Sequence, residues 1–463
     1  MVFPSFEFAI FFPVVLAVSW LLMPRPGLWK PFILTASYVF YAAASVKYCA
    51  LLAGVALANQ AGAVLVGRQE DERRRTWITG AVVALDLGVL GLFKYYGFFT
   101  QEIGDFLDSI GLGMPLPLLT LALPVGLSFW TFQAISYVVD VKRRIIQPGK
   151  TIDVALYLSF FPHVVAGPIV RAREFLPQLA KPRDPRDVSV GAGIVLIAIG
   201  LVKKVAIADY LARTVVDPVF GVPQAYHAPD AALAAYAYAA QIYCDFSGYT
   251  DIAIGVALLM GIVFPQNFNA PYRATSFRDF WRRWHMTLSR YLRDFLYIPL
   301  GGNRHGRLQT ARNLMITMVL GGLWHGAAWG FVLWGTLHGV GLTVERYLRG
   351  RVHAPAWLRW ALVFNLVVLG WILFRTRDLH LAGDFFARFA DWGPATLWTA
   401  PVLFCVLLTI GLQLLPERPL EQLRFRFAEL QPAALGVGLA LVVGFVGATV
   451  PANAVPPFIY FQF

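Results

Sequence analysis

Apolar runs long enough to cross a lipid bilayer recur from one end of this chain to the other. A helix needs about 20 mostly apolar residues to span the hydrocarbon core. Only 14% of the residues are charged, against about 25% in soluble domains. The sequence therefore predicts an all-α, polytopic membrane helical bundle. No long polar segment could fold alone, so residues 1–463 are expected to form a single integral-membrane domain. The predicted crossings are 7–23, 31–46, 48–67, 76–98, 117–139, 188–208, 232–260, 357–374, 395–415 and 433–450.

The basic residues of the chain indicate which connections face the cytoplasm. A net charge of +12 would suggest nucleic acid binding in a soluble protein. Here Lys and Arg fall in connections between apolar runs, as they do in cytoplasmic loops of membrane proteins. Loop 68–75 is therefore predicted inside, and both termini outside, with 99–116 and 209–231 as outer loops. We expect no nucleic acid partner, whereas anionic lipid could bind the basic loops. The first apolar run lacks the basic N-terminal region and the clear cleavage site of a signal peptide. We therefore interpret it as a membrane span that stays in the protein.

Two segments have basic residues on both sides and do not fit a single crossing. In 152–170, Pro162, Gly167 and Pro168 interrupt regular helix, and we interpret the segment as re-entrant from the cytoplasm. Irregular backbone at membrane depth is tolerated where protein or a water cavity surrounds it. Segment 314–345 is predicted to be a hairpin or re-entrant pair, broken at Gly321–Gly322 or within 326–335.

The second of these segments, with GGLWHGAAW near its middle, carries the principal candidate for catalysis. His325 follows Arg312 by 13 residues, which is about 20 Å along a helix. An ionisable group at that depth is usually functional, and a neutral imidazole can act as a general base. Trp324 and Trp329 are expected to form apolar walls around it. The alternative is a buried histidine that bonds a carbonyl.

His338 lies 13 residues beyond His325. On one continuous helix the two would be about 220° apart, so His338 is expected to face away and to make a structural hydrogen bond. Histidine spacings such as HxxxH and HExxH, which are typical of zinc sites, do not occur. No metal site is predicted.

Residues 277–307 are predicted to form an amphipathic helix at the cytoplasmic interface, because their apolar residues recur at helical spacing. Its arginines are either ordinary headgroup anchors or the ligands of donor phosphates, since Arg makes bidentate phosphate contacts. Arg282, Arg283 and Arg304 are the candidates for the second role. His285 is either a second catalytic group or a residue that orients a neighbour. Asp294 is expected to pair with Arg290 or Arg293.

Two further groups of polar residues lie within apolar segments. In 239–255, the carboxylates of Asp245 and Asp251 need partners at membrane depth. They either tie spans together, which is the favoured reading, or line a path for the acceptor. His163 is expected to cap or support its loop, with a functional role as the alternative.

Three long motifs together resemble the membrane-bound O-acyltransferase (MBOAT) family. They are YCDFSGYTDIAIG, PQNFNAPYRATSFRDFWRRWHMTLSRYLRDFLYIPLGGNR and GGLWHGAAWGFVLWGTLHG. The segment SFFPHVVAGPIVRAREFLPQL, the opening MVFPSFEFAIFFPV and the closing PPFIYFQF are similar to the bacterial alginate O-acetylation branch, the AlgI type. The resemblance covers nearly the whole chain. It implies a bundle with re-entrant segments and a central funnel or tunnel, and it places the two histidines of the family at His325 and His285.

The same resemblance implies the expected activity. Acetyl would come from cytoplasmic acetyl-CoA and cross the bacterial inner membrane for O-acetylation of an exported polysaccharide such as alginate. A separate periplasmic acetyltransferase of the SGNH type would complete the transfer. The alternatives are a transporter of a glycan or acyl carrier without chemistry of its own, a D-alanyl transferase and a lipid-directed acyltransferase.

Overall fold

The computed structural model describes residues 1, 3, 5–112, 121–351 and 353–449, and helices with no strand make up their secondary structure. The predicted all-α fold is confirmed. The chain divides into two compact units, residues 1–193 with 256–265 and residues 194–255 with 266–463. That residues 1–463 form a single domain stays a prediction. The start of the predicted crossing 117–139 and the closing motif PPFIYFQF lie outside the described residues.

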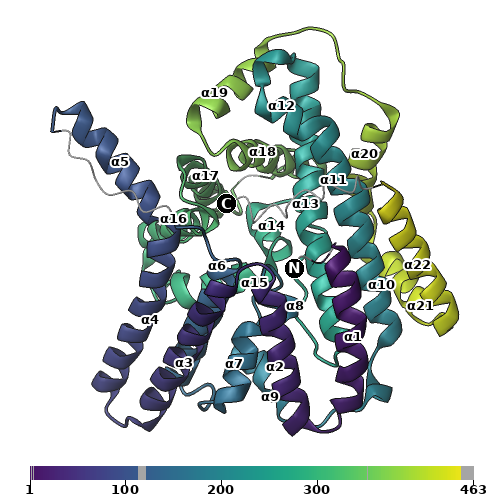
Figure 1. The fold of residues 1–463 in the computed structure, drawn as a ribbon. Helices are drawn as coiled ribbons and strands as arrows, with labels where there is room; N and C mark the ends of the chain where they lie inside the picture. The colour runs from purple at the N-terminus through teal and green to yellow at the C-terminus, as the bar shows by residue number, and fades with distance from the viewer. Residues whose placement is uncertain (2, 4, 113–120, 352, 450–463) are drawn as a thin grey trace. The chain divides into compact units, whose positions relative to one another are not determined.

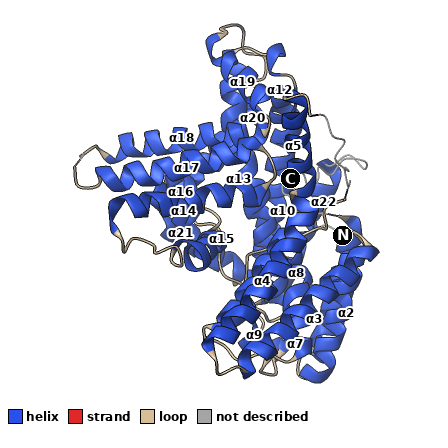
Figure 2. Cartoon of the chain, turned by 90° about the vertical axis from the view of Figure 1, so that its left-hand side faces the viewer, coloured by secondary structure: helices blue, strands red, loops and turns tan. Residues whose placement is uncertain are grey.

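The first unit is built mainly from N-terminal helices. In Figures 1 and 2, α2, α3 and α4 lie side by side, and α3 also packs against α6. Its helices are α1 (Phe6–Leu22), α2 (Pro26–Ala42), α3 (Val46–Arg68), α4 (Glu72–Lys94), α5 (Tyr96–Ser109), α6 (Leu127–Lys142), α7 (Thr151–Ser159), α8 (Phe161–Val164) and α9 (Ala172–Leu179). The prediction of a loop over 99–116 is wrong for the residues of α5, which are helical. Phe99, Ile103, Phe106 and Ile110 recur there at helical spacing, and the acidic residues between them obscured this pattern.

The predicted interruption of 152–170 is confirmed. Helix α7 stops at Ser159, α8 is a single turn, and the chain is then irregular until α9. His163 is fully buried, and its Nε2 lies 2.7 Å from the carbonyl oxygen of Tyr157. This contact agrees with the loop-supporting role expected for His163. The re-entrant path itself stays a prediction.

The second unit contains the long central helices and the C-terminal part of the chain. Residues Val190–Gly221 form one helical run, so the predicted outer loop 209–231 is wrong up to Gly221. The extension is helical because Leu211, Val215 and Val219 bury a continuous apolar face. The helices are α10 (Val190–Leu201), α11 (Asp209–Leu211), α12 (Asp217–Gly221), α13 (Ala228–Leu259), α14 (Phe277–Arg283), α15 (Met286–Leu292), α16 (Gly306–His325), α17 (Trp329–Leu348), α18 (Ala356–Thr376), α19 (Leu379–Ala387), α20 (Ala400–Leu414), α21 (Glu417–Ala428) and α22 (Pro432–Thr449). Helices α10 and α13 each contribute to both units.

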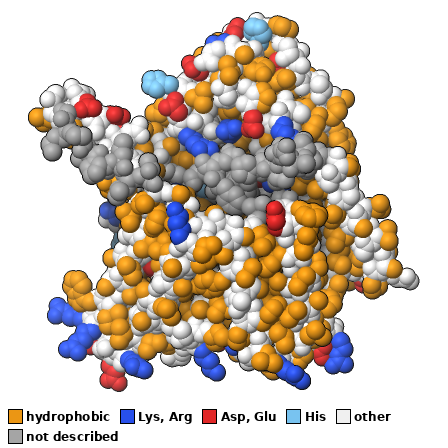
Figure 3. Space-filling model, in the orientation of Figure 1, with side chains coloured by type: hydrophobic (Ala, Val, Ile, Leu, Met, Phe, Trp, Pro, Cys, Tyr) orange, Lys and Arg blue, Asp and Glu red, His pale blue; other side chains and the backbone are white. Residues whose placement is uncertain are grey.

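Several helices have the length and composition of membrane spans. Among the described residues, five helices qualify, and a sixth does if α20 and α21, bent by 106°, count as one span. The five are α3, α4, the run Val190–Gly221, α13 and α18. The face shown in Figure 3 is mainly hydrophobic, and basic side chains gather where α3 and α4 are joined. Large apolar side chains such as Leu57 and Trp77 are exposed, as expected for lipid-facing helices.

The predicted hairpin in 314–345 is confirmed, with its break just after His325. Helices α16 and α17 are joined by residues 326–328, and Figure 2 shows α16, α17 and α18 stacked in order. Two glycines allow the first pair to approach closely. A Cβ at Gly322 would lie 2.2 Å from the Phe331 carbonyl oxygen, and one at Gly335 would lie 2.4 Å from that of Met318. Small residues permit this kind of contact between membrane helices.

We expect Gly335→Val to force α16 and α17 apart and to destabilise the protein by about 1–3 kcal/mol, the usual cost of overpacking. Thermal unfolding of the detergent-purified protein measures the change. Gly411→Val in α20 is the control, because, apart from its chain neighbours and the backbone of its own helix, no atom of the described residues lies within 4 Å of its Cβ position. Equal melting temperatures for the two variants would show that the close approach contributes nothing.

Candidate active site

Two lysines pair with the carboxylates of α13. Lys203 Nζ lies 2.7 Å from an oxygen of Asp251, and Lys204 Nζ lies 2.5 Å from Asp245 and 2.6 Å from Asp209. The side chains of Lys204 and Asp245 are almost fully buried. An ion pair at such depth is retained when both charges are satisfied. The favoured reading, in which Asp245 and Asp251 tie neighbouring helical segments together, is therefore confirmed.

The predicted continuous helix over 277–307 is wrong, because the backbone turns at His285. Helix α14 ends at Arg283, α15 begins at Met286, and His285 between them has φ 42°. A left-handed conformation costs a residue other than glycine about 1–2 kcal/mol. Apolar residues on either side of His285 recur at helical spacing, but this spacing does not reveal that the backbone turns between them.

Asn267 holds this turn from a distant loop. Its backbone oxygen accepts a hydrogen bond from Met286 N at 2.9 Å. Its side-chain oxygen accepts from Thr287 N at 3.2 Å and from Thr287 Oγ1 at 2.8 Å. Sequence reasoning missed Asn267. The only available signal was an amide within the apolar sequence VFPQNF, since a buried amide needs hydrogen-bond partners.

The side-chain oxygen of Asn267 also determines which ring nitrogen of His285 carries the proton. Nδ1 of His285 lies 3.1 Å from Asn267 Oδ1. Because this oxygen already accepts the Thr287 N–H, it is an acceptor, and Nδ1 of a neutral His285 must carry the proton. The lone pair then sits on Nε2, the nitrogen that can accept a proton. His285 itself is fully buried.

In the structure, the rings of both predicted catalytic histidines lie close to the indole of Trp324. His325 ends α16, and its ring centroid lies 4.9 Å from Trp324, 5.2 Å from Trp334 and 5.1 Å from Phe374. The Trp324 ring also lies 6.0 Å from His285. The apolar wall predicted at Trp324 is therefore present. The Trp329 side chain is 49% exposed, and the wall expected there stays a prediction.

His338 joins the same aromatic cluster, although we expected it to face away from His325. Both histidine rings contact Trp334, at 4.8 and 5.2 Å. The expectation assumed a continuous helix, and the chain reverses at Gly326 instead. Nδ1 of His338 accepts a hydrogen bond from Trp281 Nε1 at 3.2 Å. This bond agrees with the structural role expected for His338.

All three histidines are buried. His285 and His338 have no exposed surface, and His325 retains 3%. Aromatic side chains surround all three, and such apolar surroundings strengthen electrostatic contacts. The ring of His285 lies close to the same indole as His325, that of Trp324, and Asn267 accepts the hydrogen bond from its Nδ1 proton.

The three arginines predicted to bind donor phosphates differ in their surroundings. Arg283 lies 3.0 Å from Asp279 and 3.0 Å from Glu417, so its guanidinium already ties α14 to α21. Arg282 and Arg304 are exposed and make no ion pair with any described residue. The phosphate-binding role stays a prediction for all three, and Arg282 and Arg304 have the more accessible charges.

Asp294 is paired as expected. One of its oxygens lies 2.6 Å from Arg293 Nε. This short contact supports the structural reading of Asp294 over an acid's role in catalysis.

The three histidines of the cluster lie within the part of the chain that matches a known protein family. Residues 117–375, which include all three histidines of the cluster, match the family model of the membrane-bound O-acyltransferase family, MBOAT. The chain is 42% identical to "Probable alginate O-acetylase AlgI" of Azotobacter vinelandii, over 86% of this chain and 79% of that protein. Identity is 37% to "Peptidoglycan O-acetyltransferase" of Helicobacter pylori, over 77% and 72%. It is 27% to "Teichoic acid D-alanyltransferase" of Bacillus subtilis, over 55% and 69%.

Proposed function

Because this chain belongs to the membrane-bound O-acyltransferase family, in its AlgI-type branch, we propose that it takes acetyl from cytoplasmic acetyl-CoA for O-acetylation of an exported polysaccharide such as alginate. The protein is an O-acyltransferase and a multi-pass membrane protein. The observation that carries the proposal is the pair of buried histidines, His325 and His285, whose rings both lie close to the indole of Trp324. The named activities of the relatives support acetyl as the transferred group.

In the proposed reaction, His325 is the general base. Its imidazole accepts the proton of an acceptor hydroxyl while the hydroxyl oxygen attacks the thioester carbonyl. A C–O bond forms, the C–S bond breaks, and the departing thiolate takes the proton from the imidazolium. His285, whose ring lies 6.0 Å from that of Trp324, supports this step as a second proton-accepting or orienting group. Arg282 and Arg304 would hold donor phosphates, while Arg283 keeps α14 in place.

The proposed setting is the bacterial inner membrane, with both termini on the outer side. A periplasmic acetyltransferase of the SGNH type would receive the acetyl group and complete its transfer to the polysaccharide. D-alanyl transfer has weaker support, because the D-alanyltransferase relative is 27% identical over 55% of this chain. A transporter without chemistry does not fit membership of an acyltransferase family.

Acyl-donor preference of the purified protein tests the proposal. We expect transfer from radiolabelled acetyl-CoA to alginate oligosaccharides only when a candidate periplasmic acetyltransferase is present. Palmitoyl-CoA and a D-alanyl carrier protein should be poor donors. A preference for palmitoyl-CoA would instead identify a lipid-directed acyltransferase. Retention of acetyl-CoA without any turnover or transfer would contradict the proposed activity.

A further inference from the structure

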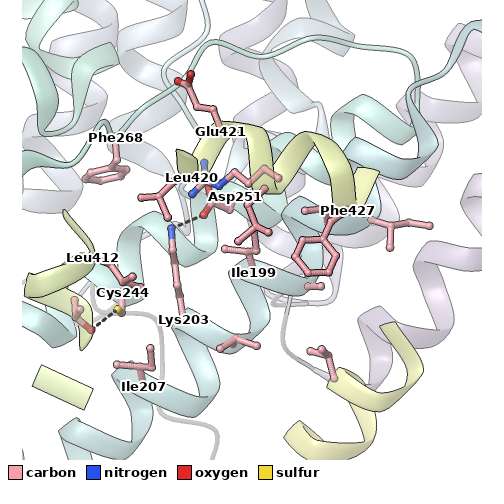
Figure 4. Close-up of a pocket in the computed structure, with 18 of the residues that line it drawn as sticks. Ile199, Lys203, Ile207, Cys244, Asp251, Phe268, Leu412, Leu420, Glu421 and Phe427 are labelled. Atoms are coloured by element: carbon pink, nitrogen blue, oxygen red, sulfur yellow. Dashed lines mark hydrogen bonds and ion pairs between the residues drawn. The ribbon is translucent and has the colours of Figure 1, made fainter. Parts of the chain in front are cut away.

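A cavity of about 650 Å³ lies within the second unit, between the run Val190–Gly221 and α13, α20, α21 and α22 (Figure 4). Its walls are mostly apolar, with Ile199 and Leu439 among them. Its volume lies within the range of ligand-binding cavities and admits part of a larger amphipathic molecule. His285, His325 and His338 are not among its lining residues, although Phe268, which lines the cavity, has its ring 6.5 Å from that of His285.

One end of the cavity carries an excess of positive charge. Lys203 Nζ forms its 2.7 Å ion pair with Asp251 there, as Figure 4 shows. Arg424 of α21 also lines the cavity. Arg424 makes no ion pair with any described residue. Two cations and one carboxylate leave a single positive charge, and an anion between the two cations would relieve their repulsion.

The other two carboxylates of the cavity do not cancel this charge. Glu417 is held by Arg273 at 2.9 Å and by Arg283 at 3.0 Å. In Figure 4 the Glu421 side chain extends from α21 away from the Lys203–Asp251 pair. The charged end therefore suits a monoanion, whereas the rest of the cavity suits a hydrocarbon chain.

The helices around the cavity indicate where its ligand comes from. The run Val190–Gly221 and α13 are candidate membrane spans, and α22 is an apolar helix of nearly that length. Helices of this kind face the bilayer, so a molecule dissolved in the membrane is the ligand that we consider for the cavity. We propose that the cavity binds one membrane phospholipid, with an acyl chain between Ile199 and Leu439 and the phosphodiester between Lys203 and Arg424. Arg and Lys recognise phosphate through charge-assisted hydrogen bonds. The proposal concerns binding alone, so it does not depend on the acyl-transfer reaction.

The test uses full-length protein in detergent and a phosphatidylglycerol that carries a photoreactive diazirine in its acyl chain. We expect crosslinks in peptides from α10 and α22. Leu439→Trp should fill the cavity and lower the labelling about tenfold or more, a factor that corresponds to about 1.4 kcal/mol. Leu441→Trp is the matched control on the same helix, because Leu441 is 70% exposed and does not line the cavity. Should Leu439→Trp fail to fold, Ile199→Trp fills the cavity from the opposite wall.

The charged end is tested separately. Arg424→Gln should weaken lipid binding about tenfold, as loss of a charge-assisted contact does. Arg426→Gln, two residues along α21 and outside the cavity, should not. A photoreactive fatty alcohol without phosphate should label weakly, and glycerol 3-phosphate should not compete. Labelling that is unaffected by both cavity variants, that maps to other helices, or that glycerol 3-phosphate abolishes would overturn the proposal.

Discussion

His325→Ala is expected to lower the kcat/KM for acetyl transfer by a factor of about 10²–10⁴, the usual contribution of a general base. The loss should appear mainly in kcat, because the imidazole acts on the reacting hydroxyl and holds no remote part of the donor. His325 is the one histidine of the aromatic cluster with exposed surface, at 3%. Initial rates with radiolabelled acetyl-CoA, acceptor and partner measure the effect.

Two further variants separate chemistry from packing at this position. His325→Phe retains an aromatic ring against Trp324 and Phe374, so the protein should fold and insert as before, yet it should be as inactive as His325→Ala. His380→Ala in α19 is the control, because His380 is exposed on the surface. If His325→Phe retained most of the activity, His325 would be a packing residue and another group would have to accept the proton.

Local sequence patterns, each confined to a single segment, predicted much of this fold. Apolar length identified α3, α4, α13 and α18, each within a few residues of its observed bounds. Glycine content and basic flanks identified the α16–α17 hairpin. The membrane depth of a histidine singled out His325. Each of these inferences needs only neighbouring residues, because a helix in lipid must satisfy its own backbone and bury its own length of apolar surface.

What escaped prediction depends on contacts between distant segments. The turn at His285 is fixed by Asn267, which lies 18 residues earlier in the chain. The position of His338 depends on where the hairpin reverses. Lys203 and Lys204 could not be interpreted from sequence until Asp251 and Asp245 were found opposite them on α13. Spacing gives no information on such pairs, since they form only after helices pack.

Asn267→Ala is expected to lower kcat about 10- to 100-fold while leaving KM for acetyl-CoA nearly unchanged. Loss of a residue that orients a metal-ligating histidine has an effect of this size, and we expect a comparable one here. Without the amide oxygen, His285 loses the partner of its Nδ1 proton and can present either nitrogen toward Trp324. Asn267 is thus a positioning residue that acts through His285. Steady-state kinetics at several pH values measure the effect.

Asn267→Asp distinguishes this role from simple support of the backbone turn. A carboxylate still accepts the bonds of Thr287 and His285, so folding should be retained. Its negative charge favours the protonated imidazolium, and a neutral His285 then forms only at higher pH. Any part of the pH–rate profile that reports the ionisation of His285 should therefore move to higher pH by about one to three units, with activity recovered above it. Thr287→Val, which removes one hydroxyl from the same oxygen, should leave the profile in place. If Asn267→Asp and Asn267→Ala gave the same profile, Asn267 would only shape the chain between α14 and α15.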